Sequence, residues 1–150
     1  MLDHCPKDLI APLAIGAICR LRTWELGRLD WQAVDLASGF IRTEAKIAKT
    51  ATRRLIPIPD NLRAWLMPIA KSQGPINPST DDRGLNHRLV RGPACSAQVA
   101  WVKNGLRHSF CSYRLAQTNS AAQVALEAGN SPTKIFRHYR ELVTPAQAEA

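Results

Sequence analysis

The first 21 residues contain an almost continuous apolar segment instead of an amphipathic stripe. Residues 8–21 read DLIAPLAIGAICRL, and an alanine-rich apolar run of this length is typical of a helix buried on all sides. Asp8 is a suitable N-cap, and Pro12 is tolerated near the first turn. Thr23 is expected to be the N-cap of a second, short helix, because threonine is a favourable cap. The pattern therefore predicts Arg22 at the joint between two helices.

The hydrophobic period changes between residues 33 and 59. Residues 34–36, 39–45 and 53–59 are short alternating or β-branched segments, separated by a turn at residues 37–39 and closed by two prolines. Alternation with a period of two predicts strands with one buried face. We therefore expect a small three-stranded antiparallel sheet near the N-terminal half, with Lys46 and Lys49 at the tip of its second hairpin.

The helical period returns after residue 60. Asp60 is expected to cap a helix over residues 61–71 that has Trp65 on its apolar face, and residues 72–83 are expected to form a loop. Further helices are predicted over residues 85–90, 106–117, 121–128, 133–142 and from residue 144 onward. Gly129 is expected to end one of them. The fold class is therefore α+β, mainly helical, in a single domain spanning residues 1–150.

Aromatic residues outside the candidate chemistry are expected in the core. Tyr113 has helical spacing from Phe110, which favours an inward position. The four tryptophans do not alternate with arginines along the sequence, so they do not indicate a platform for stacking bases. We expect all four in the core: Trp24, Trp31, Trp65 and Trp101.

Composition adds a partner to this picture. The chain has 20 Lys and Arg against 12 Asp and Glu, a net charge of +8 and a pI near 9.9. A strong positive charge favours a polyanionic partner, most simply nucleic acid. The four cysteines have no paired spacing of the kind that holds zinc, and no apolar run is long enough to span a bilayer. We expect a cytoplasmic, DNA-associated protein that needs no metal or cofactor and has no small-molecule substrate.

Candidate chemistry is concentrated in the last third of the chain. Tyr139 lies between His138 and Arg140, and a second basic segment ends in Arg107 and His108. A tyrosine among cations can attack phosphorus, because positive charge favours the phenolate and stabilises the transition state. Alternative interpretations remain for each residue. Tyr139 can be an ordinary structural tyrosine, and His108 is more readily a hydrogen-bonding or packing partner than a base.

Arg22 also has two interpretations. Glu25 lies three residues after it, so the carboxylate can either hold the guanidinium in place for a ligand or pair with it as an ordinary surface cation. The spacing favours neither interpretation.

Four segments, in order, resemble motifs of the catalytic domain of tyrosine recombinases, the phage integrase family. Residues 22–31 (RTWELGRLDW) resemble its Arg, two residues, Glu-Leu pattern, and Lys49 before residues 53–59 resembles its hairpin lysine. Residues 103–108 resemble its His, two residues, Arg-His motif, with Lys103 taken for the first histidine. Residues 129–131 (GNS) resemble its Gly-His-Ser motif, followed by Tyr139 nine residues after Asn130.

The resemblance implies an enzyme that cleaves and rejoins double-stranded DNA through a 3′-phosphotyrosyl intermediate and assembles as a tetramer on DNA. Tyr139 would be the nucleophile, and Lys49 would protonate the leaving 5′-oxygen. Phosphate oxygens would be bound by the remaining catalytic candidates, Arg22, Arg107, Lys103 and Asn130. Contacts to DNA are expected from Lys46, Arg53, His108 and His138.

Two departures from the family pattern leave two functions open. Lys103 and Asn130 replace family histidines, and an asparagine cannot carry a proton near neutral pH. Family members usually have a helical DNA-clamping domain before the catalytic one, so we expect this chain to be an isolated catalytic domain with weaker duplex affinity. It is then either a recombinase of reduced activity or a catalytically impaired DNA-binding remnant. Retention of Tyr139 and its cationic partners favours the enzyme.

Overall fold

The computed structural model of the 150-residue chain describes residues 5–43, 54–79, 82–100, 102, 104–140 and 142–149. The chain divides into two compact units, Met1–Lys103 and Asn104–Ala150. The first unit contains the sheet, and the second contains helices only within its described part. The predicted α+β class, mainly helical with one small antiparallel sheet, is confirmed.

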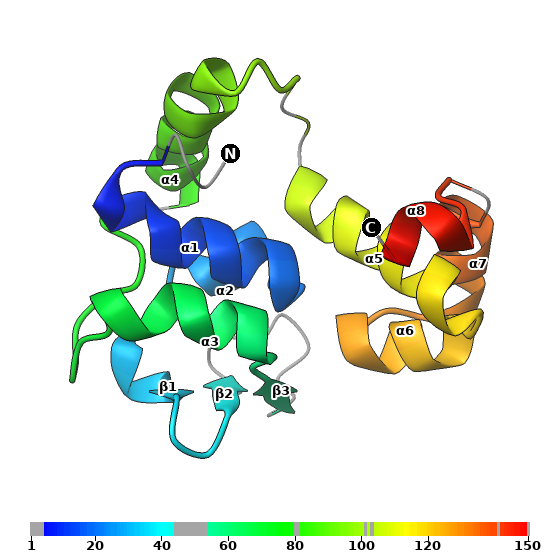
Figure 1. Ribbon diagram of the computed structural model, residues 1–150, viewed down its shortest axis with the longest axis horizontal. Coiled ribbons are helices and arrows are strands. Elements are labelled where there is room, and N and C mark those ends of the chain that lie inside the picture. The colour runs from blue at the N-terminus through cyan, green and yellow to red at the C-terminus, as the bar shows by residue number, and fades with distance from the viewer. Residues whose placement is uncertain are drawn as a thin grey trace. The chain divides into compact units, whose positions relative to one another are not determined.

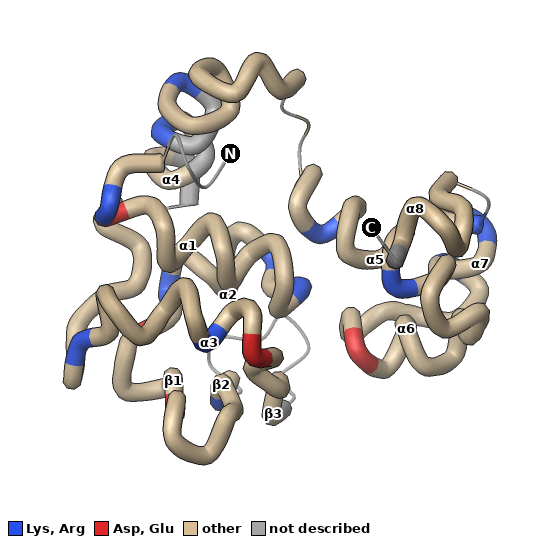
Figure 2. The backbone as a smooth tube through the Cα atoms, in the orientation of Figure 1, with Lys and Arg blue, Asp and Glu red and all other residues tan. Residues whose placement is uncertain are grey.

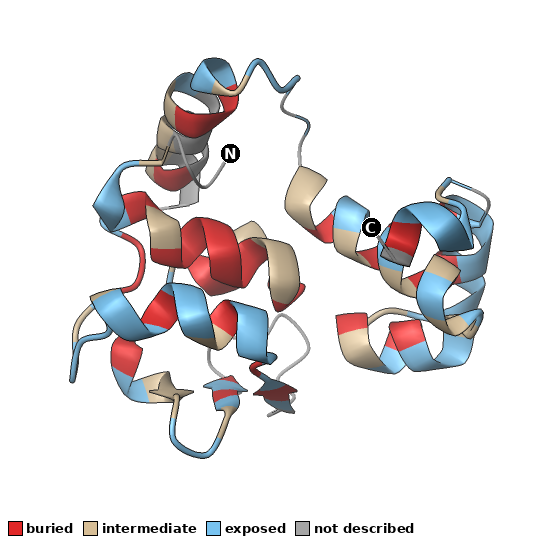
Figure 3. Cartoon of the chain, in the orientation of Figure 1, coloured by how far each residue is buried: buried red, intermediate tan, exposed pale blue. Residues whose placement is uncertain are grey.

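Helix α1 (Lys7–Ile18) forms the centre of the first unit and packs against α2 (Thr23–Leu26) and α3 (Asp60–Leu66) (Figures 1 and 3). Most of α1 is buried, as its apolar sequence predicts. The predicted cap was wrong: Pro6 occupies the N-cap position, and Asp8 lies in the first turn. Its carboxylate instead accepts a hydrogen bond from Arg88, so it is not directed at the α1 backbone.

The sheet has the order β1-β2-β3 and is antiparallel throughout. Its strands are β1 (Val34–Asp35), β2 (Phe40–Thr43) and β3 (Arg54–Pro57). Ile41 pairs with Ile56, and both are buried, whereas their neighbours Phe40 and Leu55 are exposed. The alternation therefore sets one face of the sheet against the core.

Between α2 and the sheet lies the short 3-10 helix η2 (Trp31–Ala33), and α3 continues as a 3-10 turn, η3 (Met67–Ile69). The rest of the first unit is α4 (Asp82–Leu89) followed by a π-helical segment, η4 (Val90–Ala94). Three predictions here need correction. The α-helix after residue 60 ends at Leu66, its N-cap is Pro59 instead of Asp60, and Trp65 is 39% exposed because it falls outside the stripe of Leu62 and Leu66.

The other tryptophans have different outcomes. Trp31 is buried as predicted. Trp24 is only partly buried, with the guanidinium of Arg28 over its ring. Trp101 lies outside the described residues.

The second unit consists of α5 (Gly105–Thr118), α6 (Ala121–Ala128), α7 (Pro132–Tyr139) and α8 (Pro145–Glu149). Helix α5 packs against all three of the others. The core is formed by Cys111, Leu115, Val124, Ala125, Ala128, Ile135 and Tyr139. The buried positions of α5 are residues 107, 111, 112 and 115, a stripe that omits Tyr113. Tyr113 is 47% exposed, so its predicted core position was wrong.

No helix within the described residues is long and apolar enough to cross a membrane.

Candidate active site

Tyr139 is the last residue of α7, and its position follows from how that helix starts. The Ser131 hydroxyl accepts a hydrogen bond from the Lys134 backbone at 3.3 Å, and Pro132 takes the first helical position. Ile135 and Tyr139, one turn apart, both face the core. The Tyr139 side chain is therefore held by packing, with 7% of the residue exposed.

The Tyr139 hydroxyl contacts a histidine from α5. Its oxygen lies 2.9 Å from Nδ1 of His108, a normal hydrogen-bond distance. The two rings are 5.6 Å apart between centroids and tilted by 37°. These residues are 31 positions apart in sequence, so the contact depends on the packing of α5 against α7.

Arg107, the neighbour of His108 on α5, is 8% exposed. Its Nη2 donates a hydrogen bond to the backbone carbonyl of Ala128, the last residue of α6. That carbonyl belongs to the final turn of the helix, where no intrahelical donor remains. Arg107 therefore satisfies the end of α6 and is itself held in place.

The segment Gly129-Asn130-Ser131 ends α6 in a Schellman motif. Gly129 has a φ of +57°, and the backbone N–H of Asn130 donates to the carbonyl of Ala125 at 2.9 Å. Asn130 thus follows within two residues of the carbonyl that binds Arg107, and its Oδ1 accepts from the Ser131 backbone at 3.2 Å. The turn therefore begins one residue after the carbonyl that binds Arg107.

The pKa of Tyr139 is raised above its ordinary value of 10.0. Burial is the largest cause, and the neighbouring Cys111 thiol raises the pKa further, whereas the charge of Arg107 lowers it. The charge of Arg107 does favour the phenolate, as expected, but desolvation outweighs it in the free protein. At neutral pH the side chain is a neutral phenol, and its attack on phosphorus requires removal of a proton.

Arg22 belongs to the first unit and is paired with Glu25. The carboxylate accepts from the Arg22 backbone N–H at 2.8 Å and from its guanidinium at 3.2 Å. Glu25 is 1% exposed and the Arg22 side chain 25% exposed. Arg22, instead of the predicted Thr23, is the N-cap residue of α2. Arg22 does stand at a helix joint as predicted. The contact with Glu25 forms the ion pair and also orients the guanidinium, so both interpretations of Arg22 describe the same contact.

Four predicted site residues lie outside the described residues: Lys46, Lys49, Arg53 and Lys103. The sequence itself corrects one of them. Three residues separate Lys103 from Arg107, and the family spacing of two residues, counted back from Arg107, gives Asn104. Asn104 has a left-handed backbone and is the N-cap residue of α5. His138, predicted to contact DNA, is exposed in the last turn of α7.

Lys and Arg positions occur along both α5 and α7 in the second unit (Figure 2). The acidic residue of α6, Glu127, is bound by Arg114 through two hydrogen bonds of 3.0 and 2.9 Å. Cys111 was not singled out from the sequence as part of the site. It lies three residues after His108 and four after Arg107, a spacing that places it on the same face of α5.

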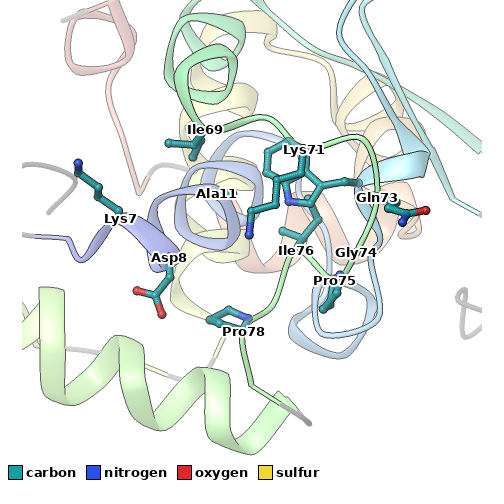
Figure 4. Close-up of a pocket in the computed structure, with 11 residues that line it drawn as sticks. Lys7, Asp8, Ala11, Ile69, Lys71, Gln73, Gly74, Pro75, Ile76 and Pro78 are labelled. Atoms are coloured by element: carbon teal, nitrogen blue, oxygen red, sulfur yellow. The ribbon is translucent and has the colours of Figure 1, made fainter.

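A separate cavity of about 480 Å³ lies in the first unit (Figure 4). Lys7 and Asp8 of α1 line one side, and the loop that includes Lys71 and Gly74 lines the other. None of the predicted site residues that the structure describes lines it. All four cysteines are free thiols, and the described residues include no cluster of three metal-binding side chains.

The structure is similar to that of the integrase from mycobacterium phage Brujita, with a TM-score of 0.70 over 97% of this chain. The sequences are 16% identical, and the chain spans 50% of the length of that integrase. No protein-family model matches the chain, and no curated protein matches its sequence. The similarity establishes an integrase-like fold.

Proposed function

We propose that this chain is a DNA strand-transfer domain of the tyrosine recombinase kind, acting in site-specific recombination or integration. The observation that carries the proposal is the position of Tyr139. Its hydroxyl contacts His108 of α5, and the neighbouring Arg107 of α5 is held by the backbone carbonyl of Ala128. The integrase-like fold and the order of the four motifs support the same assignment. The net charge of +8 suits double-stranded DNA as the partner.

In the proposed reaction the Tyr139 oxygen attacks a DNA phosphodiester. A 3′-phosphotyrosyl bond forms, and the bond from phosphorus to the 5′-oxygen breaks. A 5′-hydroxyl of another strand then attacks the phosphotyrosine, which forms a new phosphodiester and releases the tyrosine. Each step exchanges one phosphoester for another, so the bond energy is conserved and no ATP is needed.

The cations supply electrostatic stabilisation in this scheme. Arg107 and Arg22 are assigned to the non-bridging phosphate oxygens, since a guanidinium matches their geometry. Lys49 is assigned as the acid that protonates the leaving 5′-oxygen. Asn104, at the family spacing from Arg107, and Asn130 are assigned to further hydrogen bonds with the phosphate, and Lys46, Arg53, His108 and His138 to DNA contacts. Assembly of several copies on the DNA belongs to the same proposal.

A second function, a DNA-binding remnant without catalysis, is favoured by two observations. Asn130 stands where the family has a proton-carrying histidine. The pKa of Tyr139 is raised by burial, which lowers the fraction of the reactive phenolate. The two functions differ in whether a covalent intermediate forms.

The test is a suicide-substrate assay with nicked duplexes drawn from the DNA that flanks the gene. The nick lets a short 5′-hydroxyl fragment diffuse away, so a covalent complex accumulates and is visible on a denaturing gel. If the chain is an active recombinase, a covalent complex should form, be lost in Tyr139→Phe and be kept in the matched control Tyr113→Phe. A complex only after Asn130→His supports a disabled site. If neither the wild type nor Asn130→His forms a complex while salt-sensitive DNA binding is retained, the result supports the DNA-binding remnant without catalysis.

A further inference from the structure

We propose that His108 is the general base that takes the proton from the Tyr139 hydroxyl as its oxygen attacks phosphorus. The role rests on the proposed strand-transfer function and falls on a residue for which the sequence favoured a DNA contact or a hydrogen-bonding partner over a base. Its basis is the 2.9 Å contact between the Tyr139 oxygen and Nδ1 of His108.

The chemistry of the two groups fits a proton transfer. The phenol has one hydrogen to donate, and a neutral imidazole that carries its own hydrogen on Nε2 leaves Nδ1 as the acceptor. His108 is an exposed residue, so its ring can exchange the proton with solvent. A base within hydrogen-bond reach of the proton that it removes meets the geometric requirement for general base catalysis.

The other residues assigned to the site are unsuited to this role. Arg107 stays protonated at all relevant pH values. Cys111 is fully buried, so its thiol cannot exchange a proton with solvent. Asn130 has no proton-accepting group near neutral pH. Since Tyr139 is a neutral phenol in the free protein, a base is needed, and His108 is the described side chain with the required geometry.

The step balances in both directions. In cleavage, the Tyr139 proton moves to Nδ1 of His108 while the oxygen–phosphorus bond forms and the bond to the 5′-oxygen breaks; Lys49, as assigned above, protonates that oxygen. In rejoining, Lys49 takes the proton of the incoming 5′-hydroxyl as that oxygen bonds to phosphorus. The phosphotyrosyl bond then breaks, and the imidazolium of His108 returns its proton to the Tyr139 oxygen.

The titratable and charged groups of the second unit near this contact lie on three helices. Tyr139 contacts it from α7, and Arg107 and Cys111 of α5 act on the same hydroxyl. Glu127 of α6 is paired with Arg114 of α5. Arg114 lies six residues after His108, about 9 Å along the helix axis at about 1.5 Å per residue. His138 and Arg140 flank Tyr139 and are exposed.

The first experiment measures single-turnover formation of the covalent complex across pH. His108→Asn keeps a hydrogen-bond acceptor for the phenol but cannot carry the proton, so we expect the rate at neutral pH to fall by roughly 10² to 10⁴. The rate of wild type should level off once His108 is neutral, and that of the variant should continue to rise with pH. Added imidazole should partly restore His108→Ala. His87→Asn, at an exposed histidine of α4, is the control.

The outcomes separate the two proposals. A His108→Asn rate within threefold of wild type, or no rescue of His108→Ala by imidazole, overturns the base and leaves strand transfer standing. A wild-type chain that forms no complex on any substrate contradicts strand transfer itself. Thermal melting and DNA binding of each variant identify any general loss of structure.

The second experiment needs no turnover and keeps the base testable in every case. NMR of ¹⁵N-histidine-labelled protein reports which ring nitrogen of His108 carries the hydrogen. The account expects hydrogen on Nε2, with an Nδ1 resonance that shifts in Tyr139→Phe and stays in Tyr113→Phe. Hydrogen on Nδ1, which would make His108 the donor to the phenol oxygen, overturns the proposal.

Discussion

The two described arginines of the proposed site are held in different ways. In the first unit, Arg22 is paired with the carboxylate of Glu25, three residues away. In the second, Arg107 donates to the neutral carbonyl of Ala128, 21 residues away. Glu25 offsets much of the charge of Arg22, whereas the Ala128 carbonyl is neutral and the charge of Arg107 lowers the pKa of Tyr139. The difference separates an arginine whose place is set by local sequence from one whose place is set by packing.

The chain offers a way to read the two units separately. All four tryptophans lie within residues 1–103, and both tyrosines lie within residues 104–150. Tryptophan fluorescence therefore follows the first unit, and the NMR signals of the tyrosine rings follow the second.

The largest effect is expected for Arg107→Ala. The substitution leaves the buried carbonyl of Ala128 without its partner and removes buried side-chain atoms. A buried acceptor without a partner costs about 1–3 kcal/mol, so the free energy of unfolding of the second unit should fall by about 2–3 kcal/mol. Urea unfolding followed by the tyrosine signals measures it. The exposed Arg137→Ala is the control, and equal stability of the two variants would contradict the anchoring role.

Glu25→Gln should have a smaller effect, on the first unit only. The amide keeps the size of the carboxylate but loses its charge, which weakens the bonds from the Arg22 backbone and guanidinium. Hydrogen bonds to a charged group contribute about 1.5–3 kcal/mol and neutral ones about 1, so we expect a loss of about 1 kcal/mol. Urea unfolding followed by tryptophan fluorescence is the measurement. A change in the tyrosine signals instead would show that the pair supports the other unit.

Gly129→Ala should cost about 1 kcal/mol in the second unit, because a side chain disfavours the left-handed conformation that Gly129 adopts at a φ of +57°. Gly92→Ala is the matched control, since Gly92 has a negative or extended φ and open space where a Cβ would lie. Thermal melting compares them, followed by the tyrosine signals for Gly129→Ala and by tryptophan fluorescence for Gly92→Ala. If the two variants melt alike, the Schellman turn does not depend on glycine.

The smallest effect is a pH dependence confined to the second unit. Because the pKa of Tyr139 is raised in the folded state, the folded state holds this proton more tightly than the unfolded state does. The associated stability is fully present below the ordinary value of 10.0 and is lost as pH rises through the folded pKa. Tyr139→Phe should reduce this alkaline loss in urea titrations, and Tyr113→Phe should not. An unchanged alkaline loss in Tyr139→Phe would contradict the burial of the phenol.

Local patterns predicted most of the fold and little of the site geometry. The three strands, the glycine that ends α6 and the spacing of Arg22 from Glu25 are features of neighbouring residues, so periodicity and capping rules reach them. The contacts of Tyr139 with His108 and of Arg107 with Ala128 join residues 31 and 21 positions apart. They depend on how α5, α6 and α7 pack, which no local pattern specifies. Trp65 and Tyr113 show the same limit, since aromatic character alone did not indicate burial.

The raised pKa of Tyr139 illustrates why motif chemistry needs a structure. The sequence places cations on both sides of the tyrosine, which suggested a phenolate. Burial in the core of the second unit reverses the balance, so the phenol holds its proton more tightly than an ordinary tyrosine does and the need for a base increases. The fully buried Cys111, one turn from both Arg107 and His108, contributes to this effect.

The most direct test of the account is to identify the amino acid that becomes attached to DNA. The wild-type chain is reacted with nicked duplexes, digested with protease and nuclease, and analysed by mass spectrometry. The account predicts a single nucleotide adduct, on the peptide that contains Tyr139, through a phosphate at the 3′ end of the DNA. An adduct on the peptide that contains Tyr113, or linkage through a 5′-phosphate, would contradict it.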